Sequence, residues 1–328
     1  MPTRVKTIIV PTMLGLAMIL VPVVLGHGYY IQILSWVYLN CLMAASMRFI
    51  MLTGHVNFAH GGFVGIGAYT SAVLVMKVGM PFWVAFPIAG IASATVALAF
   101  GLPTLKLRGA YFFMASFAFA EVIRIIFHYF FTDLFGGING LVGIPWPEPI
   151  LGILFNPNSG VNYYYLVLVV SVFSLFVFYY LERKTRLGPI LESIQQAESL
   201  AQSVGIRIMA YKVTGFVVGC FFAGVTGSLY AHMIGVISPF DFTFMLSVYC
   251  LIYVVVGGRL YFAGPIIAAA VLTFISLFWL KALGFWETVA YGAIMLITIL
   301  FLPEGMVTLP RMLKPLVHNS EQVSDLQE

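Results

Sequence analysis

The chain has 328 residues, of which 61% are hydrophobic and only 9% are charged, and its mean hydropathy is +1.02. Because soluble domains carry about 25% charged residues, this composition excludes a soluble globular protein and indicates an integral membrane protein. The net charge of +4 does not indicate nucleic-acid binding, since the basic residues lie in short connectors. The sequence has no phosphate-binding Gly-Lys loop and no nucleophile or zinc-hydrolase motif, which argues against an enzyme.

Ten apolar segments approach the length of about 20 residues that a membrane-spanning helix needs. They cover residues 8–26, 29–52, 62–78, 81–103, 109–131, 162–181, 211–235, 242–257, 263–281 and 287–302. No cleavage site follows the first segment, so we expect a retained span and not a signal peptide. The sequence therefore predicts an all-α membrane protein with about ten spans, some of them broken or re-entrant. Cys41, Cys220 and Cys250 lie in apolar windows and are expected to be packing residues.

The distribution of Lys and Arg predicts that both chain ends lie in the cytoplasm, because cytoplasmic connectors are enriched in basic residues. This orientation leaves only Lys77 and Lys281 outside, with Arg124 inside a span. The inside then holds Arg4, Lys6, Arg48, Lys106, Arg108, Arg183, Lys184, Arg186, Arg207, Lys212, Arg259, Arg311 and Lys314.

In this orientation the loop 132–162 is external, and the transmembrane domain covers residues 1–317. The loop has no Lys or Arg and is rich in Gly, Pro and Asn, so we expect a turn-rich rim in preference to a floppy connector. The tail 318–328 is polar and is expected to be disordered.

One long polar segment, residues 182–212, interrupts the apolar spans on the inner side. From Leu187 its apolar residues recur at helical spacing and form one stripe: Leu187, Leu191, Ile194, Ala197, Ala201 and Val204. The opposite face is polar, and Gly205 suits the C-terminus of a helix. A lipid-bound helix carries Lys and Arg on its polar face, and this one does not, so we expect it to dock on a soluble partner.

The segment "LTGHVNFAHGGFVGIGAY" places His55, Asn57, His60 and five glycines where a span should be apolar. Two interpretations remain open. The histidines and Asn57 mark a broken helix beside a translocation path, or the glycines serve close helix packing and the histidines bond to the backbone. A metal site is disfavoured, since no acidic third ligand lies nearby.

Glu121 and Arg124 share one helix face at a spacing of three residues, so we expect an ion pair. It either lies beside the path or is a neutralised structural pair. The small residues Gly215, Gly219, Ala223 and Gly227 recur every four residues and indicate a close-packing face, either within the chain or between subunits. The residues "GGRLYFAGP" from Gly257 are interpreted as a cytosolic turn in preference to a second half-helix break.

Several segments together resemble one known family, the LivM/LivH permeases of branched-chain amino-acid ABC importers, and more closely the LivM kind. They are "GHVNFAHGGFVGIGAYTSAVL", "LRGAYFFMASFAFAEVIR", "GGINGLVGIP", "LGPILESIQQAESLAQSVGI", "AGVTGSLYAHMIGVISP" and "LPEGMVTL". The chain departs from the family pattern at Pro189, at Gln195 and Gln196, and in "GGRLYFAGP". These departures bear on the ATPase contacts and the substrate, and not on the class.

The resemblance implies a permease subunit in a bacterial inner membrane, with lipid around it and no nucleic acid bound. Its partners would be a sister LivH-type permease, two cytoplasmic ATPases that hold ATP and Mg, and a periplasmic binding protein. This chain would need no cofactor. The substrate would be a branched-chain or other amino acid, an amide, urea or an aromatic acid. A secondary transporter or channel working alone is the alternative.

The resemblance also implies roles for individual residues. The loop 182–212 would be the ATPase-coupling loop, through Arg186, Leu187, Gly188, Leu191, Glu192, Ile194, Ala197, Glu198, Ala201, Gly205 and Ile206. The external loop would contact the binding protein through Gly136, Gly137, Asn139 and Gly140. Candidates for the translocation path are His55, Asn57, His60, Glu121 and Arg124.

Overall fold

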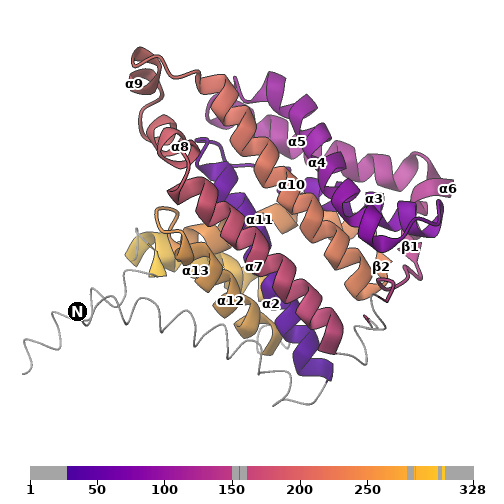
Figure 1. Cartoon of the computed structure of the whole chain (residues 1–328). Coiled ribbons are helices and arrows are strands. Elements are labelled where there is room, and N and C mark those ends of the chain that lie inside the picture. Colours follow the sequence, from indigo (N-terminus) through magenta and orange to yellow (C-terminus); the bar gives the residue numbers. More distant parts are fainter. Residues whose placement is uncertain are drawn as a thin grey trace, which may run out of the picture.

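The computed structural model describes residues 28–149, 155, 161–278, 284, 286–301 and 305–306. Within this part the chain is a bundle of α-helices (Figure 1). The predicted first span at 8–26 and the predicted disordered tail at 318–328 lie outside the described residues.

Each predicted span from residue 29 onward coincides with a helix of the described part. These helices are α2 (Gly28–Met51), α3 (His60–Met76), α4 (Phe82–Thr104), α5 (Ala110–Tyr129), α7 (Val161–Arg183), α10 (Ile208–Ile234), α11 (Phe244–Gly257), α12 (Ala263–Phe278) and α13 (Trp286–Phe301). Five of them, α2, α4, α5, α7 and α10, are long and apolar enough to cross a membrane. The helical class is therefore confirmed for the described part, whereas the total of ten spans and their orientation stay predictions.

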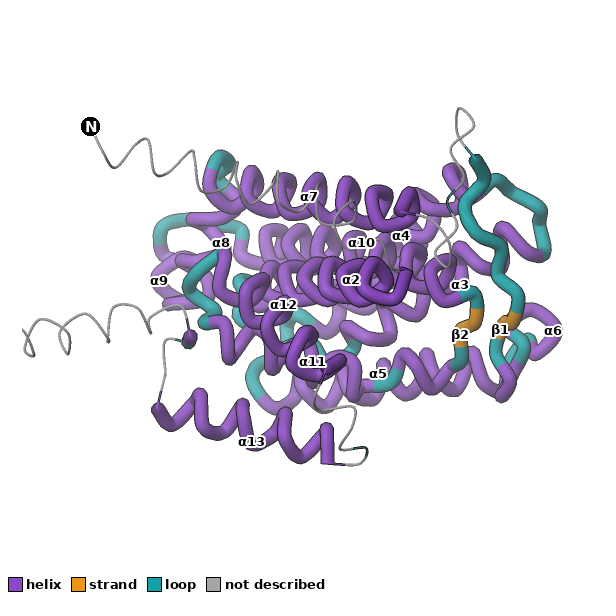
Figure 2. The backbone as a smooth tube through the Cα atoms, turned by 90° about the horizontal axis from the view of Figure 1, so that it is seen from below, coloured by secondary structure: helices purple, strands orange, loops and turns teal. Residues whose placement is uncertain are grey.

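Short elements occupy the two ends of the bundle (Figures 1 and 2). One end carries α8 (Leu187–Gln196) and α9 (Glu198–Ser203). The other carries α6 (Thr132–Phe135), the 3-10 helices η1 (Gly137–Asn139) and η2 (Pro239–Phe242), and strands β1 (Leu141–Val142) and β2 (Val236–Ile237). The two strands pair antiparallel, with Leu141 opposite Ile237, which is a small departure from the predicted all-α fold.

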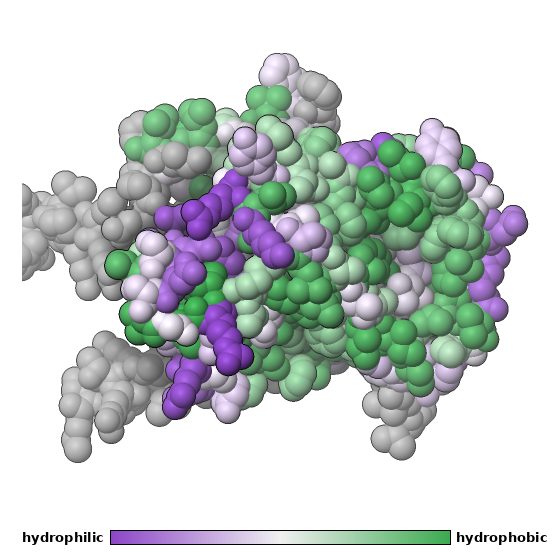
Figure 3. All heavy atoms as spheres, turned by 90° about the horizontal axis from the view of Figure 1, so that it is seen from above, coloured by the Kyte–Doolittle hydropathy of each residue, from purple (hydrophilic) through white to green (hydrophobic). Residues whose placement is uncertain are grey.

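The end with α8 and α9 is called the basic end below. Contacts of Arg48, Arg108, Lys212 and Arg259, all predicted to lie inside, join the elements there. A broad apolar belt separates this polar end from a second polar rim in Figure 3. Such a belt matches the hydrocarbon core of a bilayer. The clustering agrees with the predicted distribution of basic residues.

Helix α10 runs through the centre of the bundle and packs against α2, α3 and α4. Its small residues permit this approach: a Cβ on Gly227 would overlap the Val64 carbonyl, and one on Gly219 would overlap Ile50. A Cβ on Gly67 of α3 would likewise overlap the Gly224 carbonyl of α10. The small-residue face of α10 therefore serves packing within this chain. Cys41, Cys220 and Cys250 are buried and free, as expected of packing residues.

Gly67→Ala should destabilise the protein by about 1–3 kcal/mol, because the added methyl group forces the α3 and α10 backbones apart. Gly292→Ala is the matched control, since nothing lies within 4 Å of a Cβ added there. Thermal unfolding in detergent measures both. A Gly67→Ala variant as stable as Gly292→Ala would contradict the close approach.

Candidate functional site

The predicted coupling segment forms two short helices and not one. Helix α8 ends at Gln196, Ala197 is extended (φ −154°, ψ 90°), and α9 begins at Glu198. The single helix predicted through Val204 is therefore wrong at Ala197. Gly205 does follow the last helix as predicted: its φ is +85°, and the Ile206 amide donates to the Ala201 carbonyl (3.2 Å), as in a glycine-terminated helix end.

The apolar stripe of this segment packs on the chain itself. Leu191, Ile194 and Ala201 are buried, and Leu191 belongs to a cluster with Phe49 of α2 and Phe178 of α7. The Gln195 side chain donates to the Met51 carbonyl at the end of α2 (3.2 Å). The buried part of the stripe is thus neither a free docking face nor a lipid-facing one, because the bundle already covers it, whereas Val204, the last member of the stripe, is exposed.

The exposed surface of the segment consists of residues other than the buried Leu191, Ile194 and Ala201. Leu200 is 67% exposed and Val204 is 80% exposed, and the two lie four residues apart. Glu192 and Ala197 are half-buried, whereas Arg186 and Gly205 are exposed. Any partner of this segment meets Leu200, Val204 and their polar neighbours, and not Leu191 or Ile194.

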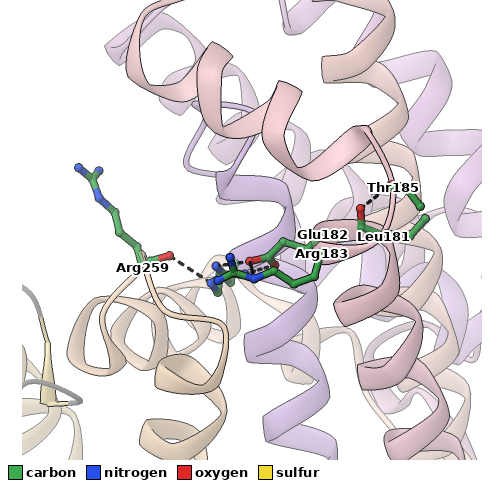
Figure 4. A network of polar contacts seen from close by, with 6 residues as sticks. Leu181, Glu182, Arg183, Thr185 and Arg259 are labelled. Carbon is green, nitrogen blue, oxygen red and sulfur yellow. Dashed lines mark hydrogen bonds and ion pairs between the residues drawn. The ribbon is translucent and has the colours of Figure 1, made fainter.

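A buried ion pair anchors the segment to the transmembrane helices (Figure 4). Arg48 of α2 donates to both carboxylate oxygens of Glu182 at the end of α7, from Nη1 to Oε2 (2.5 Å) and from Nη2 to Oε1 (2.9 Å). The two side chains are 3% and 0% exposed. Arg48 Nε donates to the backbone carbonyl of Arg259 (3.1 Å), in the turn between α11 and α12.

The bidentate pair fixes α2 relative to α7, because a guanidinium and a carboxylate align in one plane. The bond from Nε of Arg48 adds the α11–α12 turn as a third element. Gly188 of α8 packs against the Glu182 backbone so closely that a Cβ would overlap the Glu182 carbonyl. The base of α8 is therefore positioned by the ion pair. Sequence reasoning placed Arg48 among connector residues and missed this pair. The sequence did hold a signal for this pair, because Arg48 and Glu182 lie at the ends of two apolar runs on the same predicted side of the membrane.

A second charge cluster links α9 to α10 at the basic end. Glu198 pairs with Lys212 Nζ (3.0 Å) and more distantly with the exposed Arg108 (3.9 Å). Lys212 is buried, so its charge needs this carboxylate. The bend at Ala197 aims α9 so that Glu198 reaches Lys212.

The polar break predicted at His55 and Asn57 exists, as a buried non-helical connection from Leu52 to Ala59 between α2 and α3. His55 lies between two backbone carbonyls, with Nε2 3.1 Å from Leu107 O and Nδ1 3.1 Å from Thr53 O. Asn57 Oδ1 accepts from the Ala59 amide (3.0 Å), and its Nδ2 is buried without a hydrogen-bond partner.

His60 begins α3, with its Nε2 3.1 Å from Ser46 Oγ and its Nδ1 buried without a partner. The glycines that follow pack closely: a Cβ on Gly61 would lie 2.6 Å from Thr243 O, and one on Gly65 would lie 2.8 Å from Phe242 Cβ. The structure therefore shows both the broken helix and the close packing, and a place of these residues beside a translocation path stays a prediction. The described residues contain no group of three or more potential metal ligands.

A cavity of about 330 Å³ lies beside the break, lined by Gly54, His55, Val56, Phe58, Gly109, Ala110, Phe112 and Phe113. Burial, and then the positive charge of Lys212, lower the pKa of His55 below its ordinary value of 6.5. A neutral ring donates to only one of its two carbonyl neighbours. The break thus holds a neutral histidine between the basic end and α5.

Glu121 and Arg124 form the predicted ion pair, with Arg124 Nε 2.7 Å from Glu121 Oε2. Both side chains are about a quarter exposed, and Arg124 lies over the Phe240 ring at 5.8 Å. Phe112 of α5 lines the same cavity as His55. Glu121 lies nine residues further along α5, which is about 13 Å along the helix axis. The structure therefore does not bring this pair together with His55.

The structure describes the predicted external loop from Thr132 to Pro149. Gly136, Gly137 and Gly140 have positive φ, and a Cβ on Gly140 would overlap the Ile237 carbonyl. The turn itself thus requires these glycines. Their contact with a binding protein stays a prediction. Asn139 between them is exposed.

A buried polar chain ties this loop to α10 and was not predicted. His232 Nδ1 donates to the Pro145 carbonyl (2.7 Å), which leaves Nε2 to accept from Ser71 Oγ (2.9 Å). Ser228 Oγ donates to Ser71 Oγ (2.8 Å). These hydrogen bonds hold the loop against α10.

The fold and this site define a multi-pass α-helical membrane protein with a short helical segment anchored at one end. Residues 29–301 match the family described as branched-chain amino acid transport system / permease component, and the chain belongs to that family. No solved structure matches it.

The relatives include two high-affinity branched-chain amino acid transport system permease proteins LivM, from Salmonella typhimurium and Escherichia coli. Each is 33% identical over 281 residues, which cover 79% of this chain and 65% of the relative. A probable branched-chain amino acid transport permease protein LivH from Methanocaldococcus jannaschii is 23% identical over 280 residues, covering 81% of this chain and 87% of that protein. The chain thus spans slightly less than two thirds of the length of the LivM proteins.

Removing one member of the buried Arg48–Glu182 pair should cost about 3–5 kcal/mol, because the other charge stays buried without a partner. The Arg48→Met/Glu182→Met double variant should lose clearly less than the sum of the two single variants. Lys184→Met is the control, since Lys184 is exposed and forms no ion pair among the described residues. Chemical unfolding in detergent measures all four, and additive losses would contradict the pairing.

The lowered pKa of His55 predicts a pH dependence of stability. As pH falls below 6.5, an unfolded or opened chain binds a proton that the closed fold resists, so stability decreases toward acid. The melting temperature of the wild type should fall more steeply between pH 7.5 and 5.5 than that of His55→Gln. Equal slopes for the two proteins would contradict a buried neutral His55.

Proposed function

We propose that this chain is the membrane-spanning permease subunit of an ABC importer in a bacterial inner membrane. Its cargo is a branched-chain or closely related amino acid delivered by a periplasmic binding protein. It pairs with a sister permease of the LivH kind, and two cytoplasmic ATPases supply the ATP and Mg that the chain does not bind itself. Membership in the permease family supports this function.

The anchored α8–α9 segment is the observation that carries the proposal. A force on this segment reaches α2, α7 and the α11–α12 turn through the Arg48–Glu182 pair and its bond to Arg259. It reaches α10 through Glu198 and Lys212. A peripheral helix pair joined to four transmembrane elements is suited to convert an ATPase movement into a change of access along the bundle.

In this proposal the basic end faces the cytoplasm and the loop 132–162 faces the binding protein. His55, Asn57 and His60 lie where the moving segment meets the bundle, so they belong to the inner end of the path. Glu121 and Arg124 lie further along α5, where a partly exposed ion pair is costly against lipid and favours a neighbouring subunit.

Reconstitution in proteoliposomes tests the function. Leucine uptake should require ATP, the ATPases, the sister permease and the binding protein together. Uptake by this chain alone, driven by an ion gradient, would overturn the proposal in favour of a secondary transporter.

Leu200→Asp/Val204→Asp should abolish co-purification of the ATPases and reduce ATP-driven uptake by at least about 10-fold, because it places two charges on the exposed apolar pair of the segment. Val142→Asp is the matched control, since this valine is 64% exposed at the opposite end. It should leave ATPase association unchanged. Full association of the double variant would exclude this surface as the docking site.

A further inference from the structure

A second cavity, of about 280 Å³, lies between α2, α11, α12 and α13, apart from the site described above. It is lined by Trp36, Asn40, Leu246, Tyr249, Tyr253, Thr273, Ser276, Leu277, Glu287 and Tyr291. Asn40 is 11 residues from the basic end of α2 and 12 from its other end, about 16 and 18 Å along the axis. The cavity is therefore near the middle of the bundle, the depth at which transporters bind their cargo.

One wall of this cavity carries a carboxylate. Glu287 lies in the first turn of α13, and Ser276 Oγ of α12 donates to its Oε1 (2.5 Å). None of the lining residues is Lys, Arg or His, and no ion pair of Glu287 occurs among the described residues. A carboxylate in an apolar segment without a cationic partner is costly, so the site favours a cation from outside the chain.

Aromatic rings surround this carboxylate. Tyr291 contacts Tyr249 edge to face, with ring centroids 5.0 Å apart, and its centroid lies 6.4 Å from that of Tyr253. Trp36 forms part of the same lining. Ring faces attract organic cations, and they do so more strongly where water is excluded. The cavity thus offers an ammonium group a carboxylate and several aromatic side chains.

The rest of the lining suits the remainder of a small amphipathic molecule. Leu246 and Leu277 are apolar, whereas Asn40 and Thr273 are polar and hydrogen-bonded to each other (2.9 Å). The volume lies near the lower end of the range of small-molecule sites, about 300–1,000 Å³, which suits a ligand of amino-acid size.

We propose that this cavity binds a small organic ammonium compound through Glu287 and the surrounding aromatic rings, and that in transport it receives the α-ammonium group of the amino acid cargo. The second part rests on the proposed function. The site recognises the ammonium group and not the carboxylate of the cargo, because no basic side chain lines it among the described residues. Leu246 and Leu277 contact an aliphatic side chain.

Ligand binding tests the site directly. The full chain, with the partners that co-purify, is placed in lipid nanodiscs and titrated with radiolabelled leucine against two competitors. Isopentylamine keeps the ammonium group and lacks the carboxylate, and 4-methylpentanoate is the reverse. Leucine should bind, isopentylamine should compete and 4-methylpentanoate should not. Equal competition by both, or competition by the carboxylate alone, overturns the proposal.

Variants locate the binding. Glu287→Gln should weaken leucine and isopentylamine binding by at least about 10-fold, and Trp36→Leu should weaken both by several-fold, with melting temperatures showing that each is folded. Glu148→Gln, at an exposed carboxylate outside the lining of this cavity, should bind like the wild type. Wild-type binding by Glu287→Gln overturns the proposal.

Lys281 is the basic residue nearest to Glu287 in sequence and lies outside the described residues. Retained binding in Lys281→Met supports the proposal. If Lys281→Met and Glu287→Gln lose binding equally and the double variant regains it, Glu287 serves only as an ion-pair partner and the proposal is wrong.

Transport separates this site from the proposed function. If the complete wild-type system fails to import leucine although the cavity binds isopentylamine, the proposed function fails and the site remains. If wild type and Glu287→Gln import leucine equally at limiting concentrations, the proposed function remains and the site fails.

Discussion

The basic end depends on one interaction, the buried ion pair between Arg48 and Glu182. Arg48 and Glu182 come from helices 134 residues apart in sequence, and both side chains are almost fully buried. Neither charge is tolerable there alone, since each loses its hydration. Helices α2 and α7 must therefore end side by side, and α8 must leave α7 at the angle that the Gly188–Glu182 contact allows.

Further polar contacts at the same end connect α8 and α9 to the transmembrane helices. The Glu198–Lys212 pair holds α9 to α10, the Gln195 side chain holds α8 to the end of α2, and His55 joins the break after α2 to the start of α5. A displacement of α8 and α9 is thus shared among several spans. This arrangement is what a subunit driven from outside requires, because a single contact would bend locally and transmit little.

The opposite end is held mainly by backbone geometry and hydrogen bonds. Its glycines occupy positive φ angles, β1 pairs with β2, and His232 bonds the loop to α10 through Pro145. Between the two ends, α10 lies against its neighbours through glycines, so its position leaves little freedom for bulkier residues. The bundle therefore has a stiff rim and centre, and its charged contacts lie where the proposed ATPases would act.

The amino-acid sequence by itself determined where the helices lie in the chain, because each long apolar run has to form a helix to satisfy its backbone in lipid. It also determined the Glu121–Arg124 ion pair and the helix end at Gly205, since both depend on residues within one helical turn. Local spacing did not show that Ala197 breaks the coupling segment, or that Leu191 and Ile194 face the bundle.

Only the tertiary structure decided those points, together with the Arg48–Glu182 pair and the cavity around Glu287. Each depends on groups that are distant in sequence and meet only when the helices pack. Periodicity reports which residues share a face, but it does not report whether that face meets lipid, a partner or the protein's own core.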